Sequence, residues 1–303
     1  MKGDLMERVD LLVTGANGQL GRELCRRASA QGLSVTPAYR PDFDITDHKL
    51  VEKVLQRSNA SIVVNAAAYT AVDKAEDDPE TAFSVNRDGP AFLASCCREL
   101  GVPLIHISTD YVFDGTKNEP YVVTDPVNPV NIYGESKAAG ENEVRKRHEH
   151  HIIIRTSWLY GIEGSNFVKT MLRLGMEKQE LRVVSDQFGC PTSAGELSSC
   201  ILAIAGHILA ARPTRWGTYH CCAKGRTSWY GFAQEIFDVA QRHLNLKLER
   251  VIPVTTEEFP TKARRPSNSV LDCSAVGHYF GFFPSPWREP LPGLIALLAS
   301  SMV

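Results

Sequence analysis

Long apolar runs are missing from this sequence, and so is the apolar core of a secretory signal. The longest apolar stretch, Ile201 to Ala211, is too short to span a bilayer and is interrupted by His207. The first residues include the acidic Asp4 and Glu7, where a signal peptide would need apolar side chains. We therefore expect a cytoplasmic protein that does not associate with a membrane.

A charge excess of either sign is also missing. The chain has 33 Lys and Arg against 35 Asp and Glu, which gives a formal net charge of −2. Proteins that bind nucleic acid usually carry a basic excess, so we expect no nucleic-acid partner and small ligands instead. With 303 residues, 43% of them hydrophobic, the chain is long and apolar enough for a sizeable core.

Paired cysteine motifs are absent as well. No C-x-x-C spacing occurs, so neither a zinc site nor a thioredoxin-like motif is indicated. We expect buried free thiols in a reducing compartment. The cysteines are Cys25, Cys96, Cys97, Cys190, Cys200, Cys221, Cys222 and Cys273. The segment His148-Glu149-His150-His151 lies between a polar helical run and an apolar strand, which favours a solvated helix end, and no metal site is expected.

The chain does contain a glycine-rich turn at its start. Val9 to Val13 is a short apolar run typical of a buried strand, and apolar residues at helical spacing follow the turn. Gly15 would permit the tight turn, Gly18 would let the backbone approach a pyrophosphate, and Gly21 would let helix and strand pack closely. The spacing is G-x-x-G-x-x-G and not the standard G-x-G-x-x-G. The turn nevertheless stands at the start of a chain in which strands and helices alternate, and this position favours a dinucleotide site.

Strands and helices alternate with a period of about 30 residues up to residue 155. Buried strands are expected over residues 33–38, 61–64, 102–107 and 151–155, and a long helical stretch over residues 79–100. The pattern predicts an α/β protein with a Rossmann-like, doubly wound parallel sheet and a smaller, mixed α/β substrate domain. The dinucleotide-binding domain would span residues 1–156 and the substrate domain residues 157–303, with later segments free to cross back.

The residues after the second strand bear on the choice of cofactor. An acidic residue there would select a ribose 2′-hydroxyl, whereas an arginine favours a 2′-phosphate. Arg40 stands at the predicted strand end, and no acidic residue occupies positions 38 to 41. Asp42 and Asp44 follow closely and could reach the 2′-hydroxyl. We therefore predict NADPH as the preferred cofactor, with NADH as the alternative.

Tyr133 and Lys137 are four residues apart, which places them on one face of a helix with Cβ atoms roughly 5–6 Å apart. Lowering the pKa of a tyrosine from about 10 to near 7 needs roughly 4 kcal/mol. One ammonium at ~4 Å in an effective dielectric of ~20 supplies about that much. The pair is therefore a candidate proton donor. Thr109 ends the fourth buried strand, where it can offer a hydroxyl beside a nicotinamide.

Several motifs together resemble a known family. They are T-G-x-x-G-x-x-G from residue 14, N-A-A-A-Y-T-A-V-D-K-A-E at 65–76, S-T-D-Y-V-F-D-G at 108–115 and Y-G-E-S-K at 133–137. These resemble the extended short-chain dehydrogenase/reductases, and specifically the dTDP-4-dehydrorhamnose reductases. The stretches R-T-S-W at 155–158, D-Q-F-G-C-P-T at 186–192 and A-R-R-P-S-N-S at 263–269 resemble substrate-side motifs of the same family. The resemblance covers nearly the whole chain.

The resemblance implies an activity and roles for three residues. The family reduces the 4-keto group of dTDP-4-dehydro-L-rhamnose with a nicotinamide cofactor, giving a sugar donor for the cell wall and other polysaccharides. Tyr133 would protonate the developing alkoxide, Lys137 would bind the nicotinamide ribose and lower the tyrosine pKa, and Thr109 would donate a hydrogen bond to the carbonyl oxygen.

The resemblance also implies binding residues for the cofactor and the nucleotide sugar. The implied cofactor contacts are Gly15, Asn17, Gly18, Gln19, Leu20, Arg40, Asp44, Ile45, Ala68, Tyr69, Thr70, Tyr133 and Lys137. The implied substrate contacts are Thr109, Asp110, Trp158, Arg264 and Arg265. Trp158 would pack on the sugar or base, and an arginine could pair with the diphosphate. Structural roles for these last residues, in an aromatic core or a surface salt bridge, stay open.

Two alternatives stay open. A reductase of another nucleotide-linked 4-keto sugar, such as a UDP-linked one, would differ only in details of the pocket. The regulatory β subunits of methionine adenosyltransferase retain much of this framework as partner-binding proteins without turnover. The complete set of Thr109, Tyr133 and Lys137 weighs against that second alternative. A homodimer is compatible with each of them.

Overall fold

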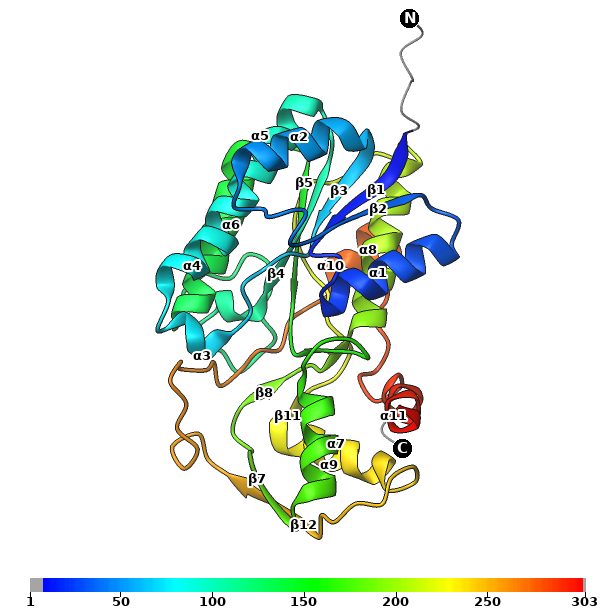
Figure 1. Cartoon of the computed structure of the whole chain (residues 1–303). Coiled ribbons are helices and arrows are strands. Elements are labelled where there is room, and N and C mark those ends of the chain that lie inside the picture. Colours follow the sequence, from blue (N-terminus) through cyan, green and yellow to red (C-terminus); the bar gives the residue numbers. More distant parts are fainter. Residues whose placement is uncertain (1–7, 302–303) are drawn as a thin grey trace, which may run out of the picture.

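A six-stranded sheet in which every pairing is parallel forms the centre of the larger part of the molecule (Figure 1). The structure is a computed structural model and describes residues 8–301, so Asp4 and Glu7 lie outside the described residues. The strand order is β10-β5-β4-β3-β1-β2. The strands are β1 (Val9–Thr14), β2 (Val35–Ala38), β3 (Ala60–Asn65), β4 (Leu104–Thr109), β5 (His151–Thr156) and β10 (Gly217–His220). The expected Rossmann-like α/β class is confirmed.

Helices cover both faces of this sheet (Figure 1). One face is covered by α2 (His48–Ser58), α5 (Gly89–Leu100) and α6 (Ile132–Arg147). The other is covered by α1 (Gln19–Ala30), α8 (Ala194–Leu209) and α10 (Ser274–Phe280). Strand β1 serves both layers, because Leu11 and Val13 face one apolar cluster and Leu12 faces the other. A continuous apolar strand is typical of a sheet buried on both sides.

A smaller part of the chain packs below the carboxyl edge of the sheet (Figure 1). Its helices are α7 (Phe167–Glu177), α9 (Trp229–Ala240) and α11 (Leu291–Ser300). Its strands form three pairs, β7 (Glu180–Val184) with β12 (Arg250–Val254), β6 (Leu159–Tyr160) with β9 (Thr192–Ser193), and β8 (Phe188–Gly189) with β11 (Thr227–Ser228). A separate apolar cluster around Phe232 and Trp287 holds these elements together. The division at residue 156 stays a prediction, and α8 and β10 return to the large sheet.

The helical stretch over residues 79–100 contains a π-helical turn. It comprises α4 (Pro79–Phe83), the π turn η1 (Ser84–Asp88) and α5. Within the turn, Asn86 is buried and bonds through its side chain to the backbone amide of Tyr69 at 2.9 Å and to the hydroxyl of Ser136 at 3.0 Å. The remaining short helices are α3 (Val72–Ala75) and the 3-10 helix η2 (Asp110–Val112).

The histidines after α6 differ from the expected solvated helix end. His148 and His151 are buried, and Nε2 of His148 donates to the carbonyl of Val102 at 2.9 Å. The expectation is wrong for these two residues because β5 enters the sheet only three residues after α6 ends. Between residues 8 and 301, no group of three or more His, Cys, Asp or Glu side chains could hold a metal ion.

The cysteines and the helix lengths complete the description. All eight cysteines are free, and all except the half-buried Cys25 and Cys273 are buried. In the part of the chain that the structure describes, no helix has both the length and the apolar character needed to cross a membrane.

Helix α6 touches the π turn through a glycine. A Cβ added at Gly140 would overlap with the backbone oxygen of Asn86 and would lie 3.6 Å from Cγ of Pro90. Gly206, in α8, is exposed and has nothing within 4 Å of the corresponding position. The two glycines therefore differ in the space around them, although each lies in a helix of 16 residues.

We expect Gly140→Ala to lower the free energy of unfolding by about 1–3 kcal/mol, because the added methyl group forces α6 away from the turn. Gly206→Ala is the matched control and should raise it by roughly 0.5–1 kcal/mol, the usual gain from alanine in a helix. Urea unfolding of both variants measures the difference. If both variants changed the free energy of unfolding by the same amount and in the same direction, a close approach of α6 to the π turn at Gly140 would be contradicted.

Candidate active site

The glycine-rich turn lies at the carboxyl end of β1 and leads into α1. Gly15 has φ +65°, a conformation that favours glycine, and a Cβ there would lie 2.6 Å from the amide nitrogen of Ala67. A Cβ at Gly18 would meet only the oxygen of Gly15, at 3.2 Å, so little of the chain covers this residue. No side chain caps the start of α1 at Gly18. The uncapped helix start and the open glycine fit the pyrophosphate of a dinucleotide.

A cavity of about 140 Å³ adjoins this turn. It collects seven of the residues predicted to contact a cofactor, namely Gly15, Asn17, Gly18, Arg40, Asp44, Ile45 and Ala68. The Arg40 side chain is exposed at its edge, while the carboxylate of Asp44 already accepts bonds from the amide and hydroxyl of Thr46 at 2.9 and 2.8 Å. The cavity therefore offers a guanidinium and a partly engaged carboxylate to a ribose.

The other predicted cofactor residues do not line the cavity. Leu20 belongs to the apolar core, and Oε1 of Gln19 accepts a bond from Nδ2 of Asn166 at 2.8 Å. Asn166 is the N-cap of α7, so this bond links the two parts of the molecule. Tyr69 is held by Asn86 through its backbone, and Thr70 follows it as an exposed residue.

Three contacts fix the start of α6. Asn131 is its N-cap: its Oδ1 accepts from the amide of Gly134 at 2.8 Å, and its Nδ2 donates to the carbonyl of Arg264 at 2.7 Å. A carboxylate oxygen of Glu76 accepts from the amide of Ile132 at 2.9 Å. The bonds from the amides of Gly134 and Ile132 satisfy groups that a helix start leaves without intrahelical partners. Tyr133, in the first turn, is thereby held at a defined place beside the end of β4.

The structure brings Thr109, Tyr133 and Lys137 together. All three side chains are buried, and the Nζ atom of Lys137 donates to the carbonyl of Ile107 on β4 at 2.6 Å. The Thr109 hydroxyl donates to Oδ1 of Asp110 at 2.9 Å, and its oxygen accepts from the backbone amide of Tyr111 at 3.2 Å. The rings of Tyr133 and Tyr111 meet edge to face with centroids 5.4 Å apart.

Burial dominates the protonation of these groups. It raises the pKa of Tyr133 to about 12, against the opposing effect of the Thr109 hydrogen bond. It lowers the pKa of Lys137 to about 8, against the opposing effect of the Glu141 carboxylate. Lys137 is not among the groups that shift the pKa of Tyr133 here, and its ammonium bonds to the carbonyl of Ile107. That the ammonium brings the phenol pKa near neutrality stays a prediction.

Asp110 is buried beneath the same group. Burial raises the pKa of its carboxyl to about 6, and hydrogen bonds from Ser269 and Thr109 oppose that rise. A hydrogen bond of 2.9 Å thus joins the Thr109 hydroxyl to the Asp110 carboxylate. In this arrangement Asp110 orients the Thr109 hydroxyl, whereas its expected contact with a substrate stays a prediction.

The predicted substrate residues make protein contacts. Trp158 has φ +48°, outside the region that bulky residues usually adopt, and its ring stacks on Trp229 with centroids 3.5 Å apart. Arg265 forms an ion pair with Asp73 at 2.7 Å. The Arg264 side chain is exposed. An aromatic core and an ion pair were the structural roles left open for Trp158 and the arginines, and the contacts of all three with substrate stay predictions.

Sequence reasoning missed the buried residues that hold α6. Asn86 and Ser136 bond to each other, and Glu141 is paired with Arg155 at 2.7 Å. A lone asparagine or glutamate in a helical stretch is usually exposed, so the residue type alone does not indicate that these side chains are buried. Glu141 did carry one signal, since it continues the four-residue spacing of Tyr133 and Lys137.

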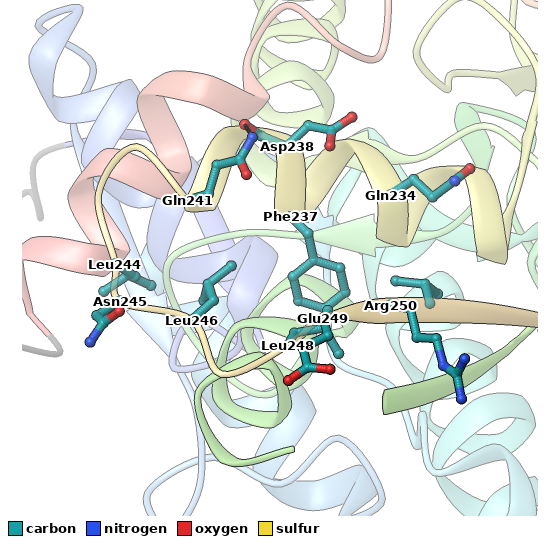
Figure 2. A pocket seen from close by; sticks show the side chains of 11 residues that line it. Gln234, Phe237, Asp238, Gln241, Leu244, Asn245, Leu246, Leu248, Glu249 and Arg250 are labelled. Atoms are coloured by element: carbon teal, nitrogen blue, oxygen red, sulfur yellow. Dashed lines mark hydrogen bonds between the residues drawn. The ribbon is translucent and has the colours of Figure 1, made fainter. Parts of the chain in front are cut away.

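A larger hollow of about 410 Å³ lies elsewhere, between α9, the chain that follows it and β12 (Figure 2). Figure 2 shows the Phe237 ring directed from α9 toward Leu246 and Leu248. None of the residues that line this hollow belongs to the predicted site. The glycine-rich turn and the edge of the sheet therefore remain the candidate site.

Comparisons with known proteins agree with this geometry. A family model described as "RmlD substrate binding domain" matches residues 9–300. A dTDP-4-dehydrorhamnose reductase of Sinorhizobium fredii is 42% identical over 286 residues, which cover 94% of this chain and 96% of that protein.

Solved structures give the same result. A dTDP-4-dehydrorhamnose reductase of Clostridium acetobutylicum matches with a TM-score of 0.89 and 41% identity, covering 96% of this chain and 99% of that one. The enzyme of Bacillus anthracis, solved in complex with NADP, matches with a TM-score of 0.87 and 39% identity, covering 95% of this chain and 99% of that one. This chain therefore belongs to the family of dTDP-4-dehydrorhamnose reductases.

Proposed function

We propose that this protein reduces the 4-keto group of dTDP-4-dehydro-L-rhamnose to give dTDP-L-rhamnose, a sugar donor for surface polysaccharides. One observation carries the proposal: Thr109, Tyr133 and Lys137 meet at the carboxyl edge of the sheet, next to a turn that fits a pyrophosphate. Ligands of open α/β sheets bind at this edge. The similarity to reductases of this substrate over more than nine-tenths of the chain supports the choice of sugar.

Tyr133 is the proton donor in this proposal. A bound nicotinamide cofactor supplies the hydride. Because burial keeps the phenol protonated at neutral pH, Tyr133 holds its proton until the carbonyl oxygen becomes basic. Lys137 stabilises the phenolate that results. Thr109 exchanges its bond to Asp110 for one to the substrate oxygen as negative charge develops there.

NADPH is the preferred cofactor in this proposal. The guanidinium of Arg40 lines the cavity next to the glycine-rich turn, where it can form a bidentate pair with a 2′-phosphate. The solved relative from Bacillus anthracis is in complex with NADP. NADH remains the alternative, since Asp44 lies in the same cavity.

We further propose a cytoplasmic location, which the eight free cysteines support because reducing compartments keep thiols unpaired. The nucleotide sugar is the expected partner, and the absence of nucleic-acid and membrane partners stays a prediction. A homodimer also stays a prediction, and light scattering coupled to gel filtration would measure it.

The test of the proposed function is NADPH oxidation with enzymatically generated dTDP-4-dehydro-L-rhamnose beside its UDP counterpart. Faster turnover of the dTDP sugar is expected. Faster turnover of the UDP sugar would favour the alternative reductase. Cofactor binding without turnover of either sugar would favour a regulatory subunit of the kind found with methionine adenosyltransferase.

We expect Tyr133→Phe to lower kcat by two or more powers of ten while the Kd for NADPH changes little, because the hydroxyl acts mainly in the transition state. The matched control is Tyr111→Phe, which removes a hydroxyl from the neighbouring ring of the same aromatic pair. The control should keep most of the activity. A Tyr133→Phe enzyme within a few-fold of the unmodified one would remove Tyr133 from the acid role.

We expect Lys137→Met to raise the Kd for NADPH by about one to two powers of ten, the range of one charge-assisted hydrogen bond. In the unmodified enzyme Lys137 is protonated below its pKa of about 8. Activity should therefore fall as the pH rises through that value, and the variant should lose this dependence. Weaker binding with the same pH profile would leave Lys137 a binding role only.

We expect Arg40→Ala to reduce the preference for NADPH over NADH by about one to two powers of ten in kcat/KM, through loss of the pair with the 2′-phosphate. Steady-state kinetics with both cofactors measures the ratio. Arg57→Ala removes an exposed arginine of α2 that does not line the cavity and serves as the control. A ratio that Arg40→Ala leaves unmoved would show that this guanidinium does not contact the phosphate.

A further inference from the structure

A buried ion pair network lies one helical turn behind Lys137. Glu141 has no exposed surface, and Arg155 is 1% exposed. Arg155 donates to both carboxylate oxygens of Glu141, from Nε at 2.8 Å and from Nη2 at 2.7 Å. Arg145 adds a third bond, from Nη2 at 2.6 Å. A carboxylate held this firmly in the interior is a fixed negative charge.

The network adjoins the proposed active site. Tyr133, Lys137 and Glu141 follow one another at intervals of four residues on one face of α6, which places the Cβ atoms of Lys137 and Glu141 roughly 5–6 Å apart. Lys137 itself reaches β4, where its Nζ atom donates to the carbonyl of Ile107. Glu141 is bonded to Arg155 on β5, the strand next to β4.

We propose that Glu141 is a positioning residue of the reductase, whose buried carboxylate keeps Lys137 protonated. Arg155 and Arg145 set how much of that negative charge acts on the lysine. This inference rests on the proposed function, because the role of Lys137 in the reduction is itself proposed.

The physical need for such a charge follows from burial. Lys137 is 2% exposed, and burial favours the neutral amine. Its pKa of about 8 already includes the opposing effect of Glu141, so loss of the carboxylate would lower the pKa of Lys137 further. A neutral lysine could neither hold a ribose by a charged hydrogen bond nor stabilise a phenolate.

The other ionisable groups around Lys137 do not replace Glu141. His106 on β4 and His220 on β10 are buried, and burial lowers their pKa, in the case of His220 to about 4, so both are neutral. Asp110 accepts a hydrogen bond from Thr109 at 2.9 Å. Tyr133 on α6 is protonated at neutral pH.

Cations nearby oppose the protonation of Lys137. Arg155 on β5 bonds to both oxygens of Glu141 through Nε and Nη2. The Arg145 side chain is 34% exposed and bonds to one of the same two oxygens. His151, at the start of β5, is buried with a lowered pKa and is neutral. Arg145 is therefore the partner that can be removed with least disturbance to the core.

Two substitutions test the inference, because they should shift the pH dependence of activity in opposite directions. Glu141→Gln should move the alkaline limb of the pH profile of kcat/KM about one unit lower, and Arg145→Gln should move it higher by a smaller amount. The pH dependence of the Kd for NADPH, followed by fluorescence, should shift in the same directions. Arg147→Gln is the matched control, since Arg147 pairs with Glu143 four residues away on the same helix, with 42% of its side chain exposed.

The inference would be overturned if the alkaline limb of the kcat/KM profile stayed in place in both Arg145→Gln and a folded Glu141→Gln protein. A shift of equal size in the Arg147→Gln control would also overturn it. If Glu141→Gln fails to fold because Arg155 loses its partner, Arg145→Gln alone decides. Failure of the proposed function would show instead as no turnover by the unmodified protein. The NADPH titrations would then still report whether Glu141 controls the protonation of Lys137.

Discussion

The placement of α6 against β4 and the π turn is the constraint on which the site depends. Backbone meets backbone at two glycines of this helix, because a Cβ at Gly134 would overlap with the oxygen of Tyr111 and one at Gly140 with the oxygen of Asn86. Asn86 also bonds to Ser136, and Asn131 caps the helix start. A shift of α6 along its axis would break these contacts, and they position Tyr133 and Lys137 relative to Thr109.

Burial is the second physical theme of the site. Four ionisable side chains of the site are buried: Tyr133, Lys137, Asp110 and Glu141. Burial raises the pKa of Tyr133 and Asp110 and lowers that of Lys137, whereas the arginines lower the pKa of Glu141 against the effect of burial. A buried phenol stays protonated, and a buried ammonium needs a counter-charge to stay protonated. In the proposed reduction the arginine-paired Glu141 supplies that counter-charge, so proton donation depends on the whole packed group and not on two residues alone.

The two parts of the molecule are joined at the same edge of the sheet. Gln19 at the start of α1 bonds to Asn166 at the start of α7, and Arg265 bonds to Asp73 on α3. The carbonyl of Arg264 meets the N-cap of α6. The segment expected to contact the nucleotide sugar thus also fixes the catalytic helix, so binding and positioning share residues.

Local pattern determined much of this protein. The apolar strands, the glycine turn and the spacing of Tyr133 and Lys137 are contiguous signals, and they predicted the parallel sheet, the confirmed fold class and the family. Contacts between distant segments had no such signal. The return of β10 to the sheet beside β5, the burial of His148 and the stacking of Trp158 on Trp229 each depend on which chain segment arrives next to which. Only the tertiary structure decided the protonation of the site, because desolvation depends on what surrounds a group in space and not on its neighbours along the chain.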